Sequence, residues 1–145
     1  MNSSCKLLLI TVVLAAMPSP APGFTSSPSE ASEWISRGLE EESRLDPLAA
    51  LECFRQAEAL GADDAFVLQK IAQQLSDAAF LETDPMATER MTREAFGYAE
   101  RAVEKNPHSA VNRLSLAIIY GRLAGYGDTR TKVNFAQRIK DEAEA

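Results

Sequence analysis

The sequence predicts an all-α protein, an α-solenoid of about three helical hairpins. After residue 24, apolar residues recur at spacings of three and four, and no stretch alternates apolar with polar residues as a half-buried strand would. Ala, Leu, Glu, Arg and Gln, which favour helices, dominate this part of the chain. The third observation is a repeat, because the large residues Trp34 and Leu68 occupy equivalent places 34 residues apart.

Residues 1–23 have the composition of a secretory signal peptide. Leu7–Met17 is an apolar run of 11 residues, whereas a helix that crosses a membrane needs roughly 20. The small residues Ala21 and Gly23 follow, which predicts cleavage after Gly23. We therefore expect a secreted or periplasmic protein with no stable membrane span, whose domain comprises residues 24–145.

Six helices are expected in that domain, each introduced by a start signal. Their predicted ranges are 29–43, 47–60, 64–80, 87–105, 109–124 and 129–143. The residues expected to cap them are Ser27, Asp46, Asp63, Asp84, Ser109 and Asp128. Pro28, Pro47 and Pro85 suit a first helical turn, and Gly61 and Gly125 suit helix ends. Short connections predict that successive helices pack as antiparallel hairpins.

The order of small and large residues is that of tetratricopeptide repeats. In the first hairpin this order is given by Trp34, Gly38, Ala50, Phe54 and Ala57. Related residues follow at Leu68, Ile71, Ala72, Leu75, Ala95, Ala99 and Ala102, and then at Leu116, Ala117, Tyr120 and Ala136. Small residues let two helices approach closely, and large ones fill the space between hairpins. The second hairpin carries extra residues in the stretch 79–91, and the third carries extra residues in 125–132.

The stretch 100–132 resembles the regulator of microtubule dynamics family, a group of tetratricopeptide-like proteins. The matching features are Ala102, Asn106-Pro107, Ala117, Tyr120–Ala124 and Asp128–Lys132. The resemblance extends from Trp34 to the end of the chain. It implies a helical-repeat adaptor without catalytic activity, and it supplies no catalytic residue.

Composition argues against several classes of function. The chain has 15 Lys and Arg residues against 21 Asp and Glu residues, a net charge of −6, which is unsuited to a nucleic acid partner. After cleavage only one Cys, Cys53, and one His, His108, remain. We expect Cys53 to be a buried, inert thiol and His108 to lie in a turn. We therefore predict no catalytic residue, no metal site and no cofactor.

The leading functional prediction is an exported interaction module that binds a peptide or protein on its concave face. The inner helices of a solenoid line this face, and by repeat phase its partner-binding residues should be Phe66, Gln69, Gln73, Leu114, Ile118 and Arg122. The alternative is a carrier that holds an apolar small molecule or lipid between hairpins, near Phe66, Leu114 and Ile118.

Two further features of the last helix remain open to interpretation. The motif Asp128–Lys132 could bind an anion or a partner at a helix N-terminus, or Asp128 and Thr129 could simply cap that helix. Val133 and Ala136 share a face that can pack on the third hairpin. Phe135 and Ile139 would then lie on an uncovered face. A second copy of the chain or a partner could associate through this face, or else the chain would be a shortened relative of longer family members.

Overall fold

The computed structural model describes residues 28–144, which form six helices and no strand. The helices are α1 (Pro28–Ser43), α2 (Pro47–Ala59), α3 (Ala65–Leu81), α4 (Pro85–Lys105), α5 (Ala110–Ala124) and α6 (Thr129–Glu144). The predicted signal peptide lies outside the described residues.

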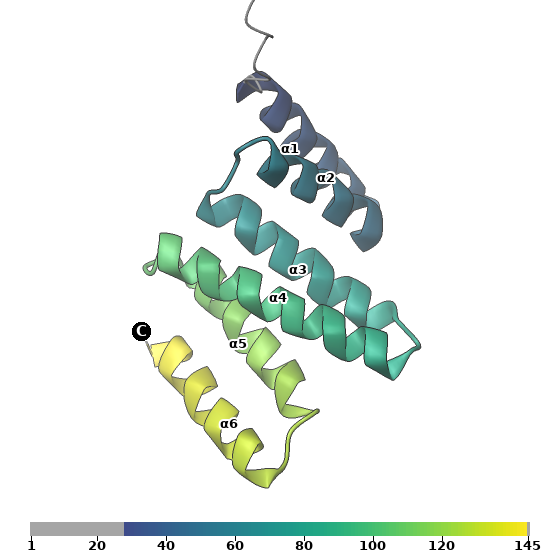
Figure 1. Ribbon diagram of the computed structural model, residues 1–145. Helices are drawn as coiled ribbons and strands as arrows, with labels where there is room; N and C mark the ends of the chain where they lie inside the picture. Colours follow the sequence, from purple (N-terminus) through teal and green to yellow (C-terminus); the bar gives the residue numbers. More distant parts are fainter. Residues whose placement is uncertain (1–27, 145) are drawn as a thin grey trace, which may run out of the picture.

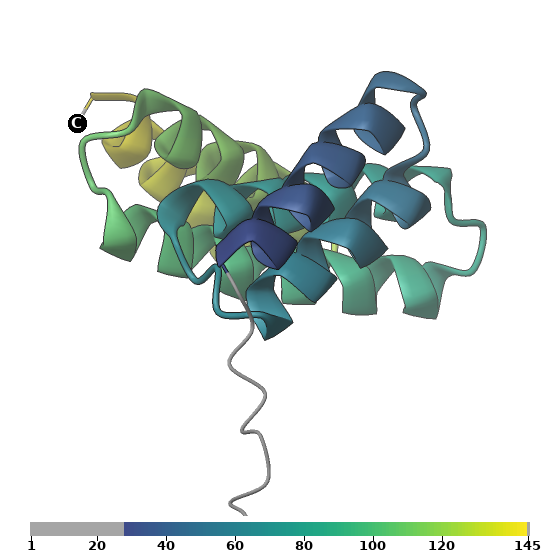
Figure 2. The same cartoon turned by 90° about the horizontal axis from the view of Figure 1, so that it is seen from above.

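Successive helices form three hairpins that are stacked along one direction, with α1 at one end and α6 at the other (Figure 1). Seen from above, the hairpins overlap (Figure 2). Each hairpin packs on the next one in the chain, through α2 against α3 and α4 against α5. The predicted all-α helical-repeat fold is confirmed.

Side-chain caps explain where most helices begin. The Oδ1 atom of Asp46 accepts the backbone N–H of Ala49 at 3.0 Å, and Ser109 accepts that of Asn112 at 3.3 Å. Asp64 caps α3 in place of the predicted Asp63. Asp84 caps α4, which therefore begins at Pro85, two residues earlier than expected. These caps satisfy backbone donors that have no partner inside the helix.

The core lies between the two layers of helices and combines small residues of one helix with large residues of another. Its buried members include Ala50, Phe54, Ala57, Val67, Ile71, Ala72, Leu75, Ala95, Ala99, Leu116 and Ile119. The closest approach is between α1 and α2. A Cβ atom placed on Gly38 would lie 2.8 Å from two ring atoms of Phe54, so only glycine fits at this crossing.

The extra residues of the second hairpin lengthen its helices. α3 has 17 residues and α4 has 21, compared with 13 in α2. The C-terminal end of α3 therefore carries Phe80 and Leu81, which are exposed. The longer hairpin supplies surface that the first hairpin lacks.

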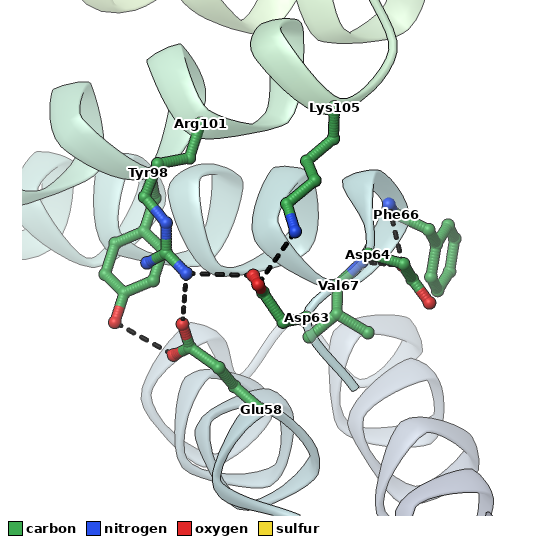
Figure 3. A network of polar contacts seen from close by, with 8 residues as sticks. All are labelled: Glu58, Asp63, Asp64, Phe66, Val67, Tyr98, Arg101 and Lys105. Carbon is green, nitrogen blue, oxygen red and sulfur yellow. Dashed lines mark hydrogen bonds and ion pairs between the residues drawn. The ribbon is translucent and has the colours of Figure 1, made fainter. Parts of the chain in front are cut away.

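A polar network joins the last turn of α2 and the loop after it to the last turns of α4 (Figure 3). Glu58 accepts from the Tyr98 hydroxyl at 3.0 Å and from Arg101 at 2.9 Å. Asp63 accepts from Arg101 at 2.9 Å and from Lys105 at 2.8 Å. The hydrogen bond from Lys105 is the main reason that the pKa of Asp63 lies below its ordinary value of 3.8. Asp63 thus anchors two hairpins to each other.

This network predicts a loss of stability in acid. Because the pKa of Asp63 is lower in the folded chain, its contribution is complete above pH 3.8 and disappears as the pH falls through the folded value. We expect Asp63→Asn to lower the melting temperature at pH 6, and the difference from wild type to shrink at pH 3. Thermal melts from pH 6 to pH 2.5 would measure this. Glu104→Gln, on the exposed surface of α4, is the control, and a difference that stayed constant with pH would contradict the assignment.

The last helix is rotated relative to the prediction. Phe135 and Ile139 are half-buried and pack against the core, and the Phe135 ring lies 5.5 Å from that of Tyr120. Val133 is 63% exposed instead. The prediction that Phe135 and Ile139 form an uncovered face is therefore wrong. The reason is that a Phe and Ile pair removes more apolar surface from water than Val and Ala do.

Phe135→Glu combined with Ile139→Lys should consequently detach α6 from α5. We expect a loss of helical circular dichroism and rapid hydrogen exchange in residues 129–144, because charged groups cannot be buried against Tyr120 without partners. Val133→Glu, on the exposed side of the same helix, should leave both signals unchanged. If the amides of α6 stayed protected from hydrogen exchange in the double variant, α6 would pack through another face.

Candidate functional site

The first helices of the hairpins, α1, α3 and α5, are joined by hydrogen bonds across one face of the solenoid. Gln73 donates to Glu42 at 3.1 Å, and Gln69 donates to Ser115 at 2.9 Å. This is the face on which partner-binding residues were predicted. Gln69 lines a depression with Phe66, but it is buried and its amide donates to Ser115, so the prediction that Gln69 is exposed on this face is wrong.

The structure divides the other predicted residues among three places. Gln73, Ile118 and Arg122 line one small cleft between α3 and α5. Phe66 lies at the other end of α3, with the Lys70 ammonium 5.8 Å from the centre of its ring. Leu114 lines a separate depression near the end of α6. Gln73 also lines the depression that holds Phe66 and Gln69, so these two places adjoin each other, whereas Leu114 lies apart from the other predicted residues.

A larger groove, with a volume of about 740 Å³, adjoins the small cleft. We call it the α3 groove. Its lining consists of Glu42 of α1, Leu45 in the following loop, Pro47 of α2, Gln73, Gln74, Asp77, Phe80 and Leu81 of α3, and Arg122 of α5. The two depressions share Gln73, Asp77 and Arg122, so they form one continuous concave surface.

Apolar side chains at the rim of the α3 groove are open to solvent. Leu45 is 86% exposed, Phe80 is 77% exposed and Leu81 is 66% exposed. The Arg122 guanidinium lies 5.6 Å from the centre of the Phe80 ring. Scattered apolar residues are normal on a protein surface, but three around one groove are typical of a binding site.

The charges along the floor of the groove are unevenly neutralised. Glu42 forms an ion pair with Lys70 at 2.7 Å and also accepts from Gln73. Asp77 has only a distant partner, since Arg122 Nη2 is 4.0 Å away and Arg122 Nη1 donates to the carbonyl oxygen of Ser76 at 2.8 Å. Loss of hydration raises the pKa of Asp77, and the negative charge of Glu42 adds to this effect.

Two buried polar atoms beside these carboxylates have no hydrogen-bond partner in the described structure. They are Gln74 Nε2 and Ser76 Oγ. Gln74 is only 2% exposed and lines the α3 groove, while Ser76 lines the adjoining cleft. Buried polar groups are nearly always paired, because each unpaired one costs free energy. The site therefore retains hydrogen-bonding capacity that the chain itself does not use.

Leu45 has an unusual backbone conformation for a leucine. Its φ is 60°, in the left-handed region. The N–H groups of Leu45 and Asp46 bond to the carbonyls of Glu42 and Glu41, so Leu45 occupies the position that ends α1 and that glycine normally takes. Gly61 occupies the same position at the end of α2, with a φ of 96°. A leucine is thus held in a strained conformation while its side chain extends into solvent.

Leu45→Gly should therefore stabilise the fold. We expect the free energy of unfolding to rise by about 1 kcal/mol, because glycine adopts the left-handed region without strain. Gly61→Leu is the matched control and should lower the free energy of unfolding by at least about 1 kcal/mol, because leucine is strained at a φ of 96°. Nothing lies within 4 Å of the missing side chain of Gly61, so no steric clash adds to this loss. Urea denaturation measures both. Destabilisation by Leu45→Gly would mean that the Leu45 side chain stabilises the fold through packing.

The remaining candidates do not line the α3 groove. Cys53 is half-buried instead of buried; its burial raises the pKa of its thiol, and Glu41 raises it further. His108 is exposed in the turn before α5. Asp128 accepts the backbone N–H of Thr131 at 2.8 Å, which lowers its pKa and caps α6. This hydrogen bond is the one expected if Asp128 caps the helix.

Residues 28–144 offer neither a metal-binding cluster nor a membrane-spanning helix. This part of the chain contains no group of three or more His, Cys, Asp or Glu side chains arranged to hold a metal ion. No helix within it is both long and apolar enough to cross a membrane.

The chain thus has the architecture of an all-α helical-repeat protein, with a groove on the face made by the first helices of its hairpins. Residues 29–145 match the family described as Regulator of microtubule dynamics protein 1-3. The match covers most of the chain, which belongs to this family. No curated protein and no solved structure matches the chain.

Proposed function

We propose that the chain is an exported, non-catalytic interaction module that binds a peptide or protein segment in the α3 groove. The observation that supports this most is the open apolar rim formed by Leu45, Phe80 and Leu81. Such a rim loses contact with water when a partner covers it, and this burial provides binding free energy. The predicted residues Gln73 and Arg122 belong to the same groove.

The geometry favours a module that binds a peptide over a carrier that holds an apolar small molecule. The residues expected to enclose an apolar ligand, Phe66, Leu114 and Ile118, are exposed and lie in separate depressions. A ligand held there would remain in contact with water. An open groove of mixed polarity instead matches a segment that keeps one side exposed.

Site-specific photocrosslinking tests this proposal. Phe80 would be replaced by benzoylphenylalanine in the full chain, produced in its native host, and the adducts identified by mass spectrometry. We expect a protein or peptide adduct at position 80, and none when the same probe replaces exposed Glu104 on α4. The adduct should be lost when Leu81→Ser is added. An adduct with the mass of a lipid, or equal labelling at both positions, would overturn the proposal.

A further inference from the structure

The α3 groove has a carboxylate with only one distant cationic partner and a hydrogen-bond donor with no partner in the described structure. Asp77 faces Arg122 at 4.0 Å, but that guanidinium donates to the Ser76 carbonyl and lies over Phe80. Glu42, the second carboxylate of the groove, already has Lys70. A cation that entered the groove would therefore be attracted most strongly by Asp77, whose side chain is 50% exposed and so open to it.

Gln74 gives a second and independent indication of a ligand. Gln74 is a lining residue of the groove, and its Nε2 atom is buried and has no partner in the described structure. This amide group can donate to a carbonyl oxygen, and a peptide backbone offers one at every residue. An apolar small molecule would leave the donor unsatisfied. The groove is therefore better suited to a polypeptide than to a hydrocarbon chain.

The apolar residues limit the sequence of that polypeptide. Leu45 and Leu81 line both the α3 groove and a neighbouring depression that also contains Leu48 and Met91. Together with Phe80 they give the groove an apolar lining next to Glu42 and Asp77. A ligand that satisfies both needs apolar side chains next to a cationic one.

We propose that the α3 groove recognises a segment of a partner protein in which one Lys or Arg side chain, placed against Asp77, is flanked by leucine-like side chains. This inference rests on the proposed function and specifies the partner. The overall negative charge of the chain, −6, favours encounter with such a basic segment. Gln74 holds the backbone of the segment, and Leu45 contacts its apolar side chains.

A random 12-residue peptide library displayed on phage provides the probe. The full chain would be immobilised, and the bound peptides sequenced. We expect wild type to enrich peptides with Lys or Arg next to Leu, Ile or Phe at least fivefold over the starting library. Asp77→Lys should reverse the preference toward Asp and Glu, and the milder Asp77→Asn should abolish it. Glu104→Lys, which places a lysine on α4 instead, should select the same peptides as wild type.

The affinity of the most enriched peptide would then be measured by fluorescence anisotropy. Replacing its basic residue by Glu should weaken binding to wild type at least tenfold, and Asp77→Lys should restore it. Leu45→Gly should weaken binding at least fivefold while the melting temperature rises, which separates recognition from folding. If binding of the enriched peptides depends on Phe80 but the peptides show no preference for Lys or Arg, this inference is overturned and the proposed function stands. Failure to enrich any peptide would overturn both.

Discussion

Gly38→Leu should lower the free energy of unfolding by about 3 kcal/mol. The expected cause is overpacking, which typically costs about 1–3 kcal/mol and occasionally more. The first side-chain atom added at Gly38 would already lie 2.8 Å from the ring of Phe54. Phe54 is fully buried, so its ring can shift only by displacing its core neighbours. The two helices of the first hairpin would have to separate, which would also disturb the packing of α2 on α3.

The matched control is Gly97→Leu. Gly97 is in the interior of α4, and nothing lies within 4 Å of its missing side chain. Leucine is a better helix former than glycine, so we expect this change to raise the free energy of unfolding by about 0.5–1 kcal/mol. Urea denaturation of both variants would give the comparison. An unchanged stability for Gly38→Leu would disprove the close approach of α1 and α2 at this residue.

Phe54→Ala should lower the free energy of unfolding by about 3–5 kcal/mol, the range for removing a buried aromatic ring. The ring contributes to the core between α1, α2 and α3, and its loss leaves a cavity beside Gly38. Trp34→Ala should lower the free energy of unfolding by less, because Trp34 is only half-buried. One face of its ring contacts the guanidinium of the exposed residue Arg37, 5.0 Å from the ring centre, instead of core side chains.

Gly38→Leu and Phe54→Ala should partly compensate each other. In the double variant Gly38→Leu with Phe54→Ala, the new leucine can occupy the space that the ring vacated. We therefore expect a loss smaller than the sum of the single losses, by about 1–3 kcal/mol. Purely additive losses in the same urea titrations would indicate that the introduced leucine does not reach the cavity left by the Phe54 ring.

The fold could be predicted because its signals are local. Apolar spacing, capping residues such as Asp46, and prolines at helix starts act within one or two turns of the chain, and they define every helix to within two residues. The phase of α6 could not be predicted in this way. Val133, Phe135, Ala136 and Ile139 offer two adjacent apolar faces, and only the position of Tyr120 in another helix decides between them.

The candidate site was predicted only in part for the same reason. Repeat phase correctly placed Gln73 and Arg122 on the inner face, but it gave no sign that Gln69 is satisfied by Ser115, 46 residues away. Leu45 was missed because a leucine in a left-handed turn looks like an ordinary loop residue in the sequence. Phe80 and Leu81 were missed because they follow the last core position of α3. Two consecutive apolar residues at a helix end were the available signal.

The unequal burial of the helices has a consequence for how the chain opens. Ten of the 17 residues of α3 are buried, whereas none in α6 is. In a linear array each element is held mainly by its neighbours, so opening begins where neighbours are fewest. From this difference in burial we expect the amide protons of α6 to exchange early and those of α3 to exchange last among the six described helices. The helix that supplies most of the groove should thus keep its structure longest during local opening.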